Sequence, residues 1–273
     1  MIEQVKEIVR QAAGLMVTER FEVTSKEGAF NIVTSSDIAV QEFLCGELRK
    51  LLPGCGFVCE EEEHHDPDKE YVWIIDPIDG TANYSRGIDH CAISVALSHN
   101  GEVTLGVVYS PHRGEMYWAC KGGGAFLSEQ RSQALGEGAE MRERRLHVSE
   151  KTFAEGLFCT AMSLYRKDLA QTCSDIIMDA YYECNDVRRF GAASIELCFL
   201  AAGICDLYFE MRLQPWDYAA AMLVLTEAGG VISGLDGRLP RLDGPDIVCA
   251  ANSPTNHARL LGIIRRHVQG RPY

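Results

Sequence analysis

Residues 73–83 read Trp-Ile-Ile-Asp-Pro-Ile-Asp-Gly-Thr-Ala-Asn and combine an apolar run with two aspartates and a glycine. The apolar run 71–75 favours a buried strand, and it stops at Asp76-Pro77 because proline cannot continue the hydrogen bonding of a strand. Two aspartates three residues apart therefore lie at the carboxyl end of that strand, followed by a Gly-Thr turn. Such a turn concentrates the hard oxygen ligands that Mg²⁺ prefers. Because Asp, Pro and Gly are also ordinary turn residues, a simple strand-ending turn is the alternative.

Two further acidic positions favour a metal site. Residues 60–63 are four consecutive glutamates after an apolar segment, and Glu60 stands 16 residues (76 − 60) before Asp76. Such a cluster is costly unless water solvates it or a cation neutralises it, so a solvated loop is the alternative. Asp217 opens a strongly apolar helix, where a carboxylate also serves as an N-terminal cap.

The charge of the chain limits its classes of partner. The 273 residues include 39 acidic and 26 basic side chains, which gives a net charge of −13. A surface with this charge repels a polyanion, so nucleic acid is not expected as a partner. An acidic protein that handles anionic substrates needs a local positive charge, and a bound metal ion supplies one.

The N-terminal stretch and the cysteines bear on location. Residues 1–16 mix charged and apolar side chains at helical spacing and lack the apolar core of a signal peptide. No stretch approaches the 18 consecutive apolar residues of a membrane span. The eleven cysteines lie scattered without a CxxC pair, as is typical of reduced thiols. We therefore expect a cytoplasmic protein without a membrane partner.

Hydrophobic periodicity predicts an α/β protein of α+β character with two unlike halves. In residues 1–146, helices are expected at 2–16 and 35–52, strands at 71–75, 91–97, 103–109 and 115–119, and an exposed loop at 137–145. In residues 147–273, strands are expected at 157–161, 205–210, 231–233 and 247–251, with helices at 168–181, 194–202, 218–228 and from Pro254 onward. The two halves are expected to share one extended body.

These motifs resemble the inositol monophosphatase family of Mg²⁺-dependent, lithium-sensitive phosphatases, in a bacterial-type member. The signatures are Asp76-Pro-Ile-Asp-Gly-Thr81 and Trp216-Asp-Tyr-Ala-Ala-Ala221, the second followed by Glu227-Ala-Gly-Gly230. Further matching segments occur in the expected order at 31–37, 106–109, 122–126 and 208–211. The resemblance implies the layered αβαβα sandwich of the inositol monophosphatase and fructose-1,6-bisphosphatase type, assembled as a homodimer.

The resemblance also implies a ligand set for two to three Mg²⁺ ions per subunit. Glu60, Asp76, the carbonyl of Ile78 and Thr81 are expected to hold the first ion. Asp76, Asp79 and Asp217 are expected to hold the second, with a weaker third ion near Glu60. By the same analogy, Asp37 and Thr81 form a hydrogen-bonded pair that orients or deprotonates the attacking water, with Glu60 assisting. The alternative for Asp37 is a helix N-terminal charge.

Substrate contacts follow from the same resemblance. The N–H groups of Gly80, Thr81 and Ala82 are expected to bind phosphate at a helix-like start. The segment from Gly191 to Ala193 and the Glu210 carboxylate are expected to contact the sugar or inositol ring. Two positions remain: Lys26 lies in the loop where the family places a helpful lysine, and Gln214 stands where animal enzymes carry His.

The expected function is hydrolysis of a small phosphorylated polyol or sugar, inositol monophosphate first, by metal-activated water. Fructose-1,6-bisphosphatase, 3′(2′),5′-bisphosphate nucleotidase and histidinol-phosphate phosphatase share the same constellation and remain alternatives. The continuation Thr81-Ala-Asn-Tyr84 is closer to inositol-phosphatase-type members than to nucleotidases, in which Lys often follows the Thr. A non-enzymatic regulator that binds the transcription machinery is the alternative of another class. The presence of every expected carboxylate favours catalysis.

Overall fold

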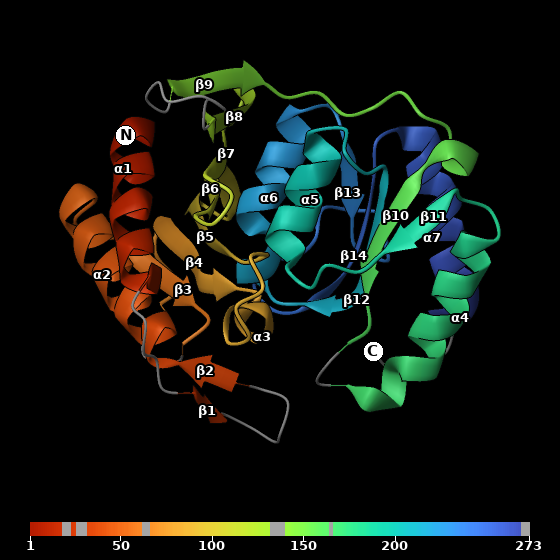
Figure 1. Cartoon of the computed structure of the whole chain (residues 1–273), viewed down its shortest axis with the longest axis horizontal. Helices are drawn as coiled ribbons and strands as arrows, with labels where there is room; N and C mark the ends of the chain where they lie inside the picture. Colours follow the sequence, from red (N-terminus) through yellow and green to blue (C-terminus); the bar gives the residue numbers. More distant parts are fainter. Residues whose placement is uncertain (18–22, 26–31, 62–65, 132–139, 164–165, 269–273) are drawn as a thin grey trace.

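The chain forms five layers in which helices and sheets alternate (Figure 1). The computed structural model describes residues 1–17, 23–25, 32–61, 66–131, 140–163 and 166–268. From one side to the other, the layers are helices α1 and α2, a seven-stranded sheet, helices α5 and α6, a five-stranded sheet, and helices α4 and α7. This is the αβαβα sandwich that the resemblance of the sequence motifs implies.

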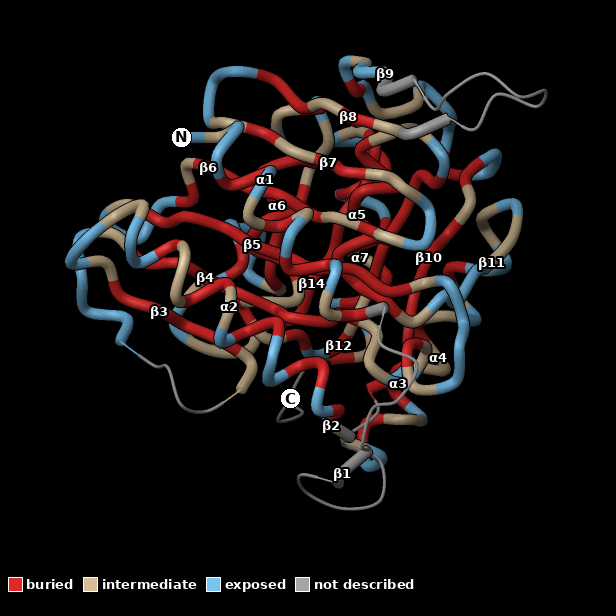
Figure 2. Tube along the Cα trace, turned by 60° about the vertical axis from the view of Figure 1, so that its left-hand side comes forward, coloured by how far each residue is buried: buried red, intermediate tan, exposed pale blue. Residues whose placement is uncertain are grey.

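The seven-stranded sheet has the order β3-β4-β5-β6-β7-β8-β9. Its strands are β3 (Gly56–Cys59), β4 (Tyr71–Asp79), β5 (Ala92–His99), β6 (Glu102–Ser110), β7 (Glu115–Cys120), β8 (Gly124–Arg131) and β9 (Glu140–Arg145). The β3–β4 pair is parallel and the other neighbours are antiparallel. β4 and β5 are buried along almost their whole length (Figure 2), because helices cover both faces of the sheet.

Helices α1 (Ile2–Ala13) and α2 (Ser35–Leu51) cover the outer face of this sheet. α1 is amphipathic, and its buried Val5 and Val9 pack with Leu44 of α2 and Trp73 of β4 in one core cluster. Short elements join this region: η1 (Gly14–Val17), the paired strands β1 (Val23–Ser25) and β2 (Ile32–Thr34), and α3 (Thr81–Tyr84).

The five-stranded sheet has the order β11-β10-β12-β14-β13. Its strands are β10 (Leu157–Ala161), β11 (Asp186–Arg188), β12 (Leu207–Leu213), β13 (Val231–Ser233) and β14 (Asp246–Ala251). Helices α4 (Ala170–Tyr181) and α7 (Pro254–Val268) cover its outer face, and the 3₁₀ turns η2 (Phe153–Glu155) and η3 (Lys167–Leu169) precede β10 and α4. β12 pairs in parallel with β10 and antiparallel with β14, so this sheet is mixed.

Helices α5 (Ala193–Ala201) and α6 (Pro215–Glu227) fill the layer between the two sheets. Both are apolar on nearly all sides, as a helix buried on every face must be. The largest core cluster joins them to residues of both sheets. The division after residue 146 stays a prediction; the seven-stranded sheet ends at Arg145 and the five-stranded sheet begins at Leu157.

The expectation of an exposed loop at 137–145 is wrong for residues 140–145, which form β9. Residues 132–139 lie outside the described residues. β9 carries no alternation of apolar side chains, so periodicity could not reveal it. Two contacts explain its position: Glu143 accepts a hydrogen bond from Ser128 of β8 (2.9 Å) and pairs with Lys6 of α1 (3.3 Å). None of the helices in the described part of the chain combines the length and apolar character of a membrane span.

Gly106 of β6 gives a direct test of the contact between the first sheet and α6. A Cβ at this position would lie 2.5 Å from the carbonyl oxygen of Ala220 and 3.0 Å from its Cα. Because backbone cannot move aside cheaply, we expect Gly106→Ala to lower the free energy of unfolding by about 3 kcal/mol in urea denaturation. Gly46 in α2 has open space around its Cβ position, so Gly46→Ala is the control and should stabilise the protein by about 1 kcal/mol. Equal effects of the two substitutions would contradict this account of the packing.

Candidate metal centre

The centre is built on the carboxyl end of β4. The register of β4 against β5 shifts between Asp76 and Asp79, so the strand bulges where its two aspartates stand. The N–H of Ile78 donates to Asp76 (3.0 Å), which fixes that carboxylate within the bulge. Both aspartates are buried, with 2% and 7% of their surface exposed. Gly80 then takes a positive φ of 88°, and a Cβ there would lie 3.0 Å from the carbonyl oxygen of His90.

Asp37 stands beside this bulge in the first turn of α2. Its Oδ2 accepts hydrogen bonds from the Thr34 N–H (2.8 Å) and hydroxyl (2.5 Å), which closes a capping box. Its Oδ1 lies 3.2 Å from the Thr81 hydroxyl, and this hydroxyl is also 2.9 Å from the Ile78 carbonyl oxygen. The structure therefore shows both the helix-capping contact and the Asp37–Thr81 hydrogen bond.

Asp79 reaches across to the N-terminus of α5. It accepts hydrogen bonds from the Ala193 N–H (3.2 Å) and from the N–H (2.7 Å) and hydroxyl (2.5 Å) of Ser194. Asp217 caps α6 in a similar way, because its Oδ2 accepts the Gln214 N–H (2.7 Å). Asp37, Asp79 and Asp217 thus lie at the N-termini of α2, α5 and α6, respectively. Each helix N-terminus carries a partial positive charge that stabilises the nearby carboxylate.

Glu60 follows the end of β3, and its N–H donates to the Ile75 carbonyl of β4 (3.2 Å). Its neighbour Glu61 exchanges hydrogen bonds with the Gln41 side chain of α2, at 3.1 and 3.2 Å. These contacts hold the start of the acidic run against β4 and α2. Residues 62–65, which include the rest of the run, lie outside the described residues.

The electrostatics of the centre are unfavourable for several negative charges. Burial raises the pKa of Asp76 well above its usual range, and the negative charges of Glu60, Asp79 and Asp217 raise it further. Burial also raises the pKa of Asp79 to about 6 and lifts that of Asp217 well above normal. Within the described part of the chain, no ion pair includes Asp37, Asp76, Asp79 or Asp217. In the described part of the chain, these four aspartates therefore have no cationic side chain to neutralise them.

The candidate ligands are all oxygen atoms, from carboxylates, a hydroxyl group and a main-chain carbonyl. Such oxygen ligands suit a hard divalent cation. Among the described residues, no three acidic, thiol or imidazole groups already face one point closely enough to hold a metal ion. The hydrogen bonds explain this, because Asp79 and Asp217 point at helix ends and Asp76 at its own turn. Metal binding would exchange some of these contacts for metal–oxygen contacts.

The residues expected to contact phosphate lie at the start of α3. Gly80 precedes this helix, Thr81 begins it and Ala82 is exposed. The first N–H groups of a helix have no intrahelical acceptor, and the phosphate contact expected here stays a prediction. Lys26 lies outside the described residues.

The residues expected to contact the ring lie opposite α3. Gly191 and Ala193 flank the start of α5, and a Cβ on Gly80 would lie 3.3 Å from the Gly191 carbonyl oxygen. Glu210 of β12 is half-buried and accepts a hydrogen bond from the Tyr208 hydroxyl (2.9 Å). Burial raises the pKa of Glu210 to about 8. Gln214 is the N-cap residue of α6, and its main-chain N–H donates to the Asp217 carboxylate.

Sequence reasoning missed several residues that hold these groups in place. Thr34 carries a readable signal, because Thr with an acid three residues later is a capping-box pattern. Ser194 and Glu196 carry none, since their importance comes from contacts with Asp79 and with the Gly191 turn. Asn83 is similar: its side-chain N–H groups donate to the carbonyls of His90 and Phe190, both at 2.8 Å.

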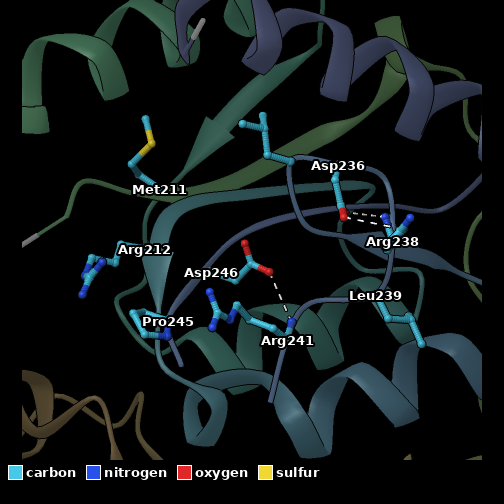
Figure 3. Close-up of a pocket in the computed structure, with 9 residues that line it drawn as sticks. Met211, Arg212, Asp236, Arg238, Leu239, Arg241, Pro245 and Asp246 are labelled. Atoms are coloured by element: carbon cyan, nitrogen blue, oxygen red, sulfur yellow. Dashed lines mark hydrogen bonds and ion pairs between the residues drawn. The ribbon is translucent and has the colours of Figure 1, made fainter. Parts of the chain in front are cut away.

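A cavity of about 540 Å³ is formed by residues of β12, of β14 and of the segment between β13 and β14 (Figure 3). It is lined by Met211, Arg212, Leu235, Asp236, Arg238, Leu239, Arg241, Pro245 and Asp246. Its arginines do not converge: Arg238 pairs with Asp236, while Arg212 points away from both. None of the predicted site residues lines this cavity.

The fold and the centre together define a class: layered αβαβα proteins whose buried acidic centre lies between two sheets. The chain belongs to the inositol monophosphatase family, because the profile described as "Inositol monophosphatase family" matches residues 1–269. An inositol-1-monophosphatase of Caulobacter vibrioides is 37% identical over 84% of this chain and 88% of its own. The Nus factor SuhB of Escherichia coli K12 is 32% identical over 82% of each chain.

Solved structures show the same similarity. An IMPase of Thermotoga maritima superimposes with a TM-score of 0.83 at 28% identity, and the match covers 98% of both chains. The extragenic suppressor protein SuhB of Bartonella henselae gives a TM-score of 0.78 at 28% identity, over 98% of this chain and 95% of its own. Fold and family are thereby confirmed.

Proposed function

We propose that the protein is a Mg²⁺-dependent phosphomonoesterase that hydrolyses a small polyol or sugar phosphate, with inositol monophosphate as the favoured substrate. The observation that carries this proposal is the cluster of buried carboxylates around Asp76. The charges of Glu60, Asp79 and Asp217 repel that of Asp76, and among the described residues no ion pair neutralises Asp76, Asp79 or Asp217. Membership of the family and a relative named inositol-1-monophosphatase support the reaction class. Two or three divalent cations would neutralise the acids and leave capacity for a phosphate dianion.

In this proposal, Glu60, Asp76, the Ile78 carbonyl and Thr81 hold one Mg²⁺ ion, and Asp76, Asp79 and Asp217 hold a second, with a weaker third ion near Glu60. Bound Mg²⁺ supplies an activated water and stabilises the leaving oxygen. Asp37 receives hydrogen bonds from Thr34, so its other oxygen can orient the Thr81 hydroxyl toward that water. Asp37 and Thr81 would then hold or accept its proton, with Glu60 assisting.

Substrate binding would divide between the two sides of the site. The N–H groups from Gly80 to Ala82 would bind the phosphate. Across the site, Gly191, Ala193 and Glu210 would bind hydroxyl groups of the polyol. A Glu210 pKa of about 8 favours the protonated acid at neutral pH, which can donate a hydrogen bond to a hydroxyl oxygen. Lys26 and Gln214 complete the proposed contacts.

The experiment that tests this proposal is phosphate release from a panel of esters with and without Mg²⁺. The panel holds inositol 1-phosphate, fructose 1,6-bisphosphate, 3′-phosphoadenosine 5′-phosphate, histidinol phosphate and glycerol 2-phosphate. We expect Mg²⁺-dependent turnover with the highest kcat/KM for inositol 1-phosphate, and inhibition by Li⁺. A higher kcat/KM for another ester would assign the protein to that sister activity, and no turnover by the folded, Mg²⁺-supplied protein would contradict the proposal.

A second candidate function rests on the names of relatives. The proteins of Salmonella typhimurium and Escherichia coli that match this chain are called Nus factor SuhB. A regulator bound to the transcription machinery would co-purify with RNA polymerase subunits, and Asp79→Asn would leave that association unchanged.

The proposed homodimer is tested in the same preparation by light scattering, which should give twice the 30.3 kDa mass of one chain.

A further inference from the structure

Glu196 is a buried acid in the first turn of an otherwise apolar helix, α5, and the proposed mechanism does not use it. Only 1% of its surface is exposed, and no ion pair in the described part of the chain includes it. Burial raises its pKa to about 7, which shows how costly its charge is there. A costly group of this kind calls for a specific role.

Its contacts indicate that role. Oε1 accepts hydrogen bonds from the N–H groups of Gly191 (2.7 Å) and Ala192 (3.4 Å). Asn83 of α3 holds the same turn from the other side, through the carbonyls of Phe190 (2.8 Å) and Gly191 (3.4 Å). Gly191 itself has a φ of 86°, so this turn adopts a conformation that needs support.

The next two N–H groups along the chain belong to Ala193 and Ser194, and both donate to Asp79. Four successive N–H groups are therefore divided between two carboxylates: the first two go to Glu196 and the last two to Asp79. Because the four N–H groups are consecutive, loss of the Glu196 acceptor would also be expected to reorient the peptide groups of Ala193 and Ser194 that face Asp79.

The second oxygen of Glu196 distinguishes it from a simple cap. Oε2 is buried and has no hydrogen-bond partner among the described residues, although one acceptor oxygen would suffice to hold the turn. The negative charge of Glu196 raises the pKa of Glu210 and of Tyr208, and the charge of Asp79 raises the pKa of Glu196. Glu196 is therefore electrostatically coupled to Glu210, one of the groups that face the polyol in the proposed function.

We propose that Glu196 is a positioning residue for the polyol side of the site: it fixes the Gly191–Ala193 backbone relative to Asp79 and so determines which polyol phosphate binds. This inference rests on the proposed function. Asp79 itself belongs to β4, and the phosphate contacts are proposed at the start of α3, so loss of Glu196 should weaken binding of the polyol more than it slows the hydrolytic step.

The test compares Glu196→Ala and Glu196→Gln with Glu155→Ala. Gln keeps an acceptor oxygen in the same place, whereas Ala leaves two N–H groups without a partner. Glu155 is the control for loss of a glutamate that accepts hydrogen bonds at a helical start, from the Thr152 N–H (3.0 Å) and hydroxyl (2.6 Å), at an exposed position. Two readouts are used: amide hydrogen exchange of residues 191–194, and KM and kcat for inositol 1-phosphate and p-nitrophenyl phosphate, an ester without a polyol.

For Glu196→Ala we expect faster exchange at all four amides and a rise of about tenfold in KM for inositol 1-phosphate. KM for p-nitrophenyl phosphate and both kcat values should change less than about threefold, and Glu196→Gln should restore protection and KM. Unchanged exchange at Ala193 and Ser194, or equal KM changes for the two esters, would overturn the inference. If the wild-type protein hydrolyses neither ester, the proposed function fails, and the exchange at Ala193 and Ser194 alone decides whether Glu196 positions them.

Discussion

Replacing Asp79 with Asn is expected to lower kcat/KM for phosphate release by a thousandfold or more. Asp79 is one of the acids proposed to hold the second Mg²⁺ ion, and several kcal/mol of transition-state stabilisation, on the order of a thousandfold in rate, depend on such ions. The variant should fold, because Asn keeps an oxygen to accept the N–H of Ser194, now 2.7 Å from Asp79. Phosphate release is measured at saturating and limiting Mg²⁺ on protein whose folding is verified by circular dichroism.

The control for this substitution is Asp206→Asn. Asp206 is equally buried and also accepts a main-chain N–H, from Leu157 at 2.8 Å, but it stands at the start of β12, away from the metal centre. We expect it to lower stability and to keep kcat/KM within about threefold. An Asp79→Asn variant that retains wild-type activity would show that this carboxylate holds no catalytic metal ion.

Removal of Mg²⁺ is expected to abolish activity and to make the folded protein less stable as the pH rises. The folded-state pKa of Asp79, about 6, lies above the unfolded value of 3.8. A raised pKa contributes stability that is complete below pH 3.8 and is lost as the pH rises through 6. In EDTA the melting temperature should therefore fall as the pH rises from about 4 to 7 and level off above that. Asp79 contributes on the order of 3 kcal/mol over its whole titration, and roughly half of this remains to be lost above pH 5.

Mg²⁺ should oppose this loss, because ions bind the deprotonated carboxylates and the stabilisation grows as protons leave. The shift in melting temperature on adding Mg²⁺ is thus expected to be larger at pH 8 than at pH 5. Asp79→Asn removes one titrating group and should flatten the decline in EDTA. A Mg²⁺-induced shift that is largest at pH 5 would contradict this electrostatic account.

The end of β4 shows why much of the fold and centre could be predicted from sequence. An apolar run that stops at Asp-Pro reports a buried strand with acids at its carboxyl end, and the structure places Asp76 and Asp79 in a bulge there. The apolar helix after Asp217 likewise reports a helix that is buried on all sides. In each case, the residue types along the segment indicate the same burial that the structure shows.

Other features depend on contacts between segments distant in sequence. Asp79 and Ser194 are 115 residues apart, and nothing near either one signals that α5 points its N-terminus at β4. β9 is polar; it pairs with β8 along its length, and its Glu143 also contacts Lys6, 137 residues away. Glu196 reads as an ordinary helical acid until the structure shows it buried against the Gly191 turn. Such pairings are set by the packing of layers, which single-sequence patterns do not encode.

Glu60, Asp76, Asp79 and Asp217 are proposed to form a Mg²⁺ site, and calorimetric titration of the metal-free protein with Mg²⁺, in the presence of inorganic phosphate, measures that binding. We expect two to three bound ions per chain for the wild-type protein and at least one fewer for Asp79→Asn. Absence of Mg²⁺ binding, or the same stoichiometry and affinity in the variant, would contradict the proposed site.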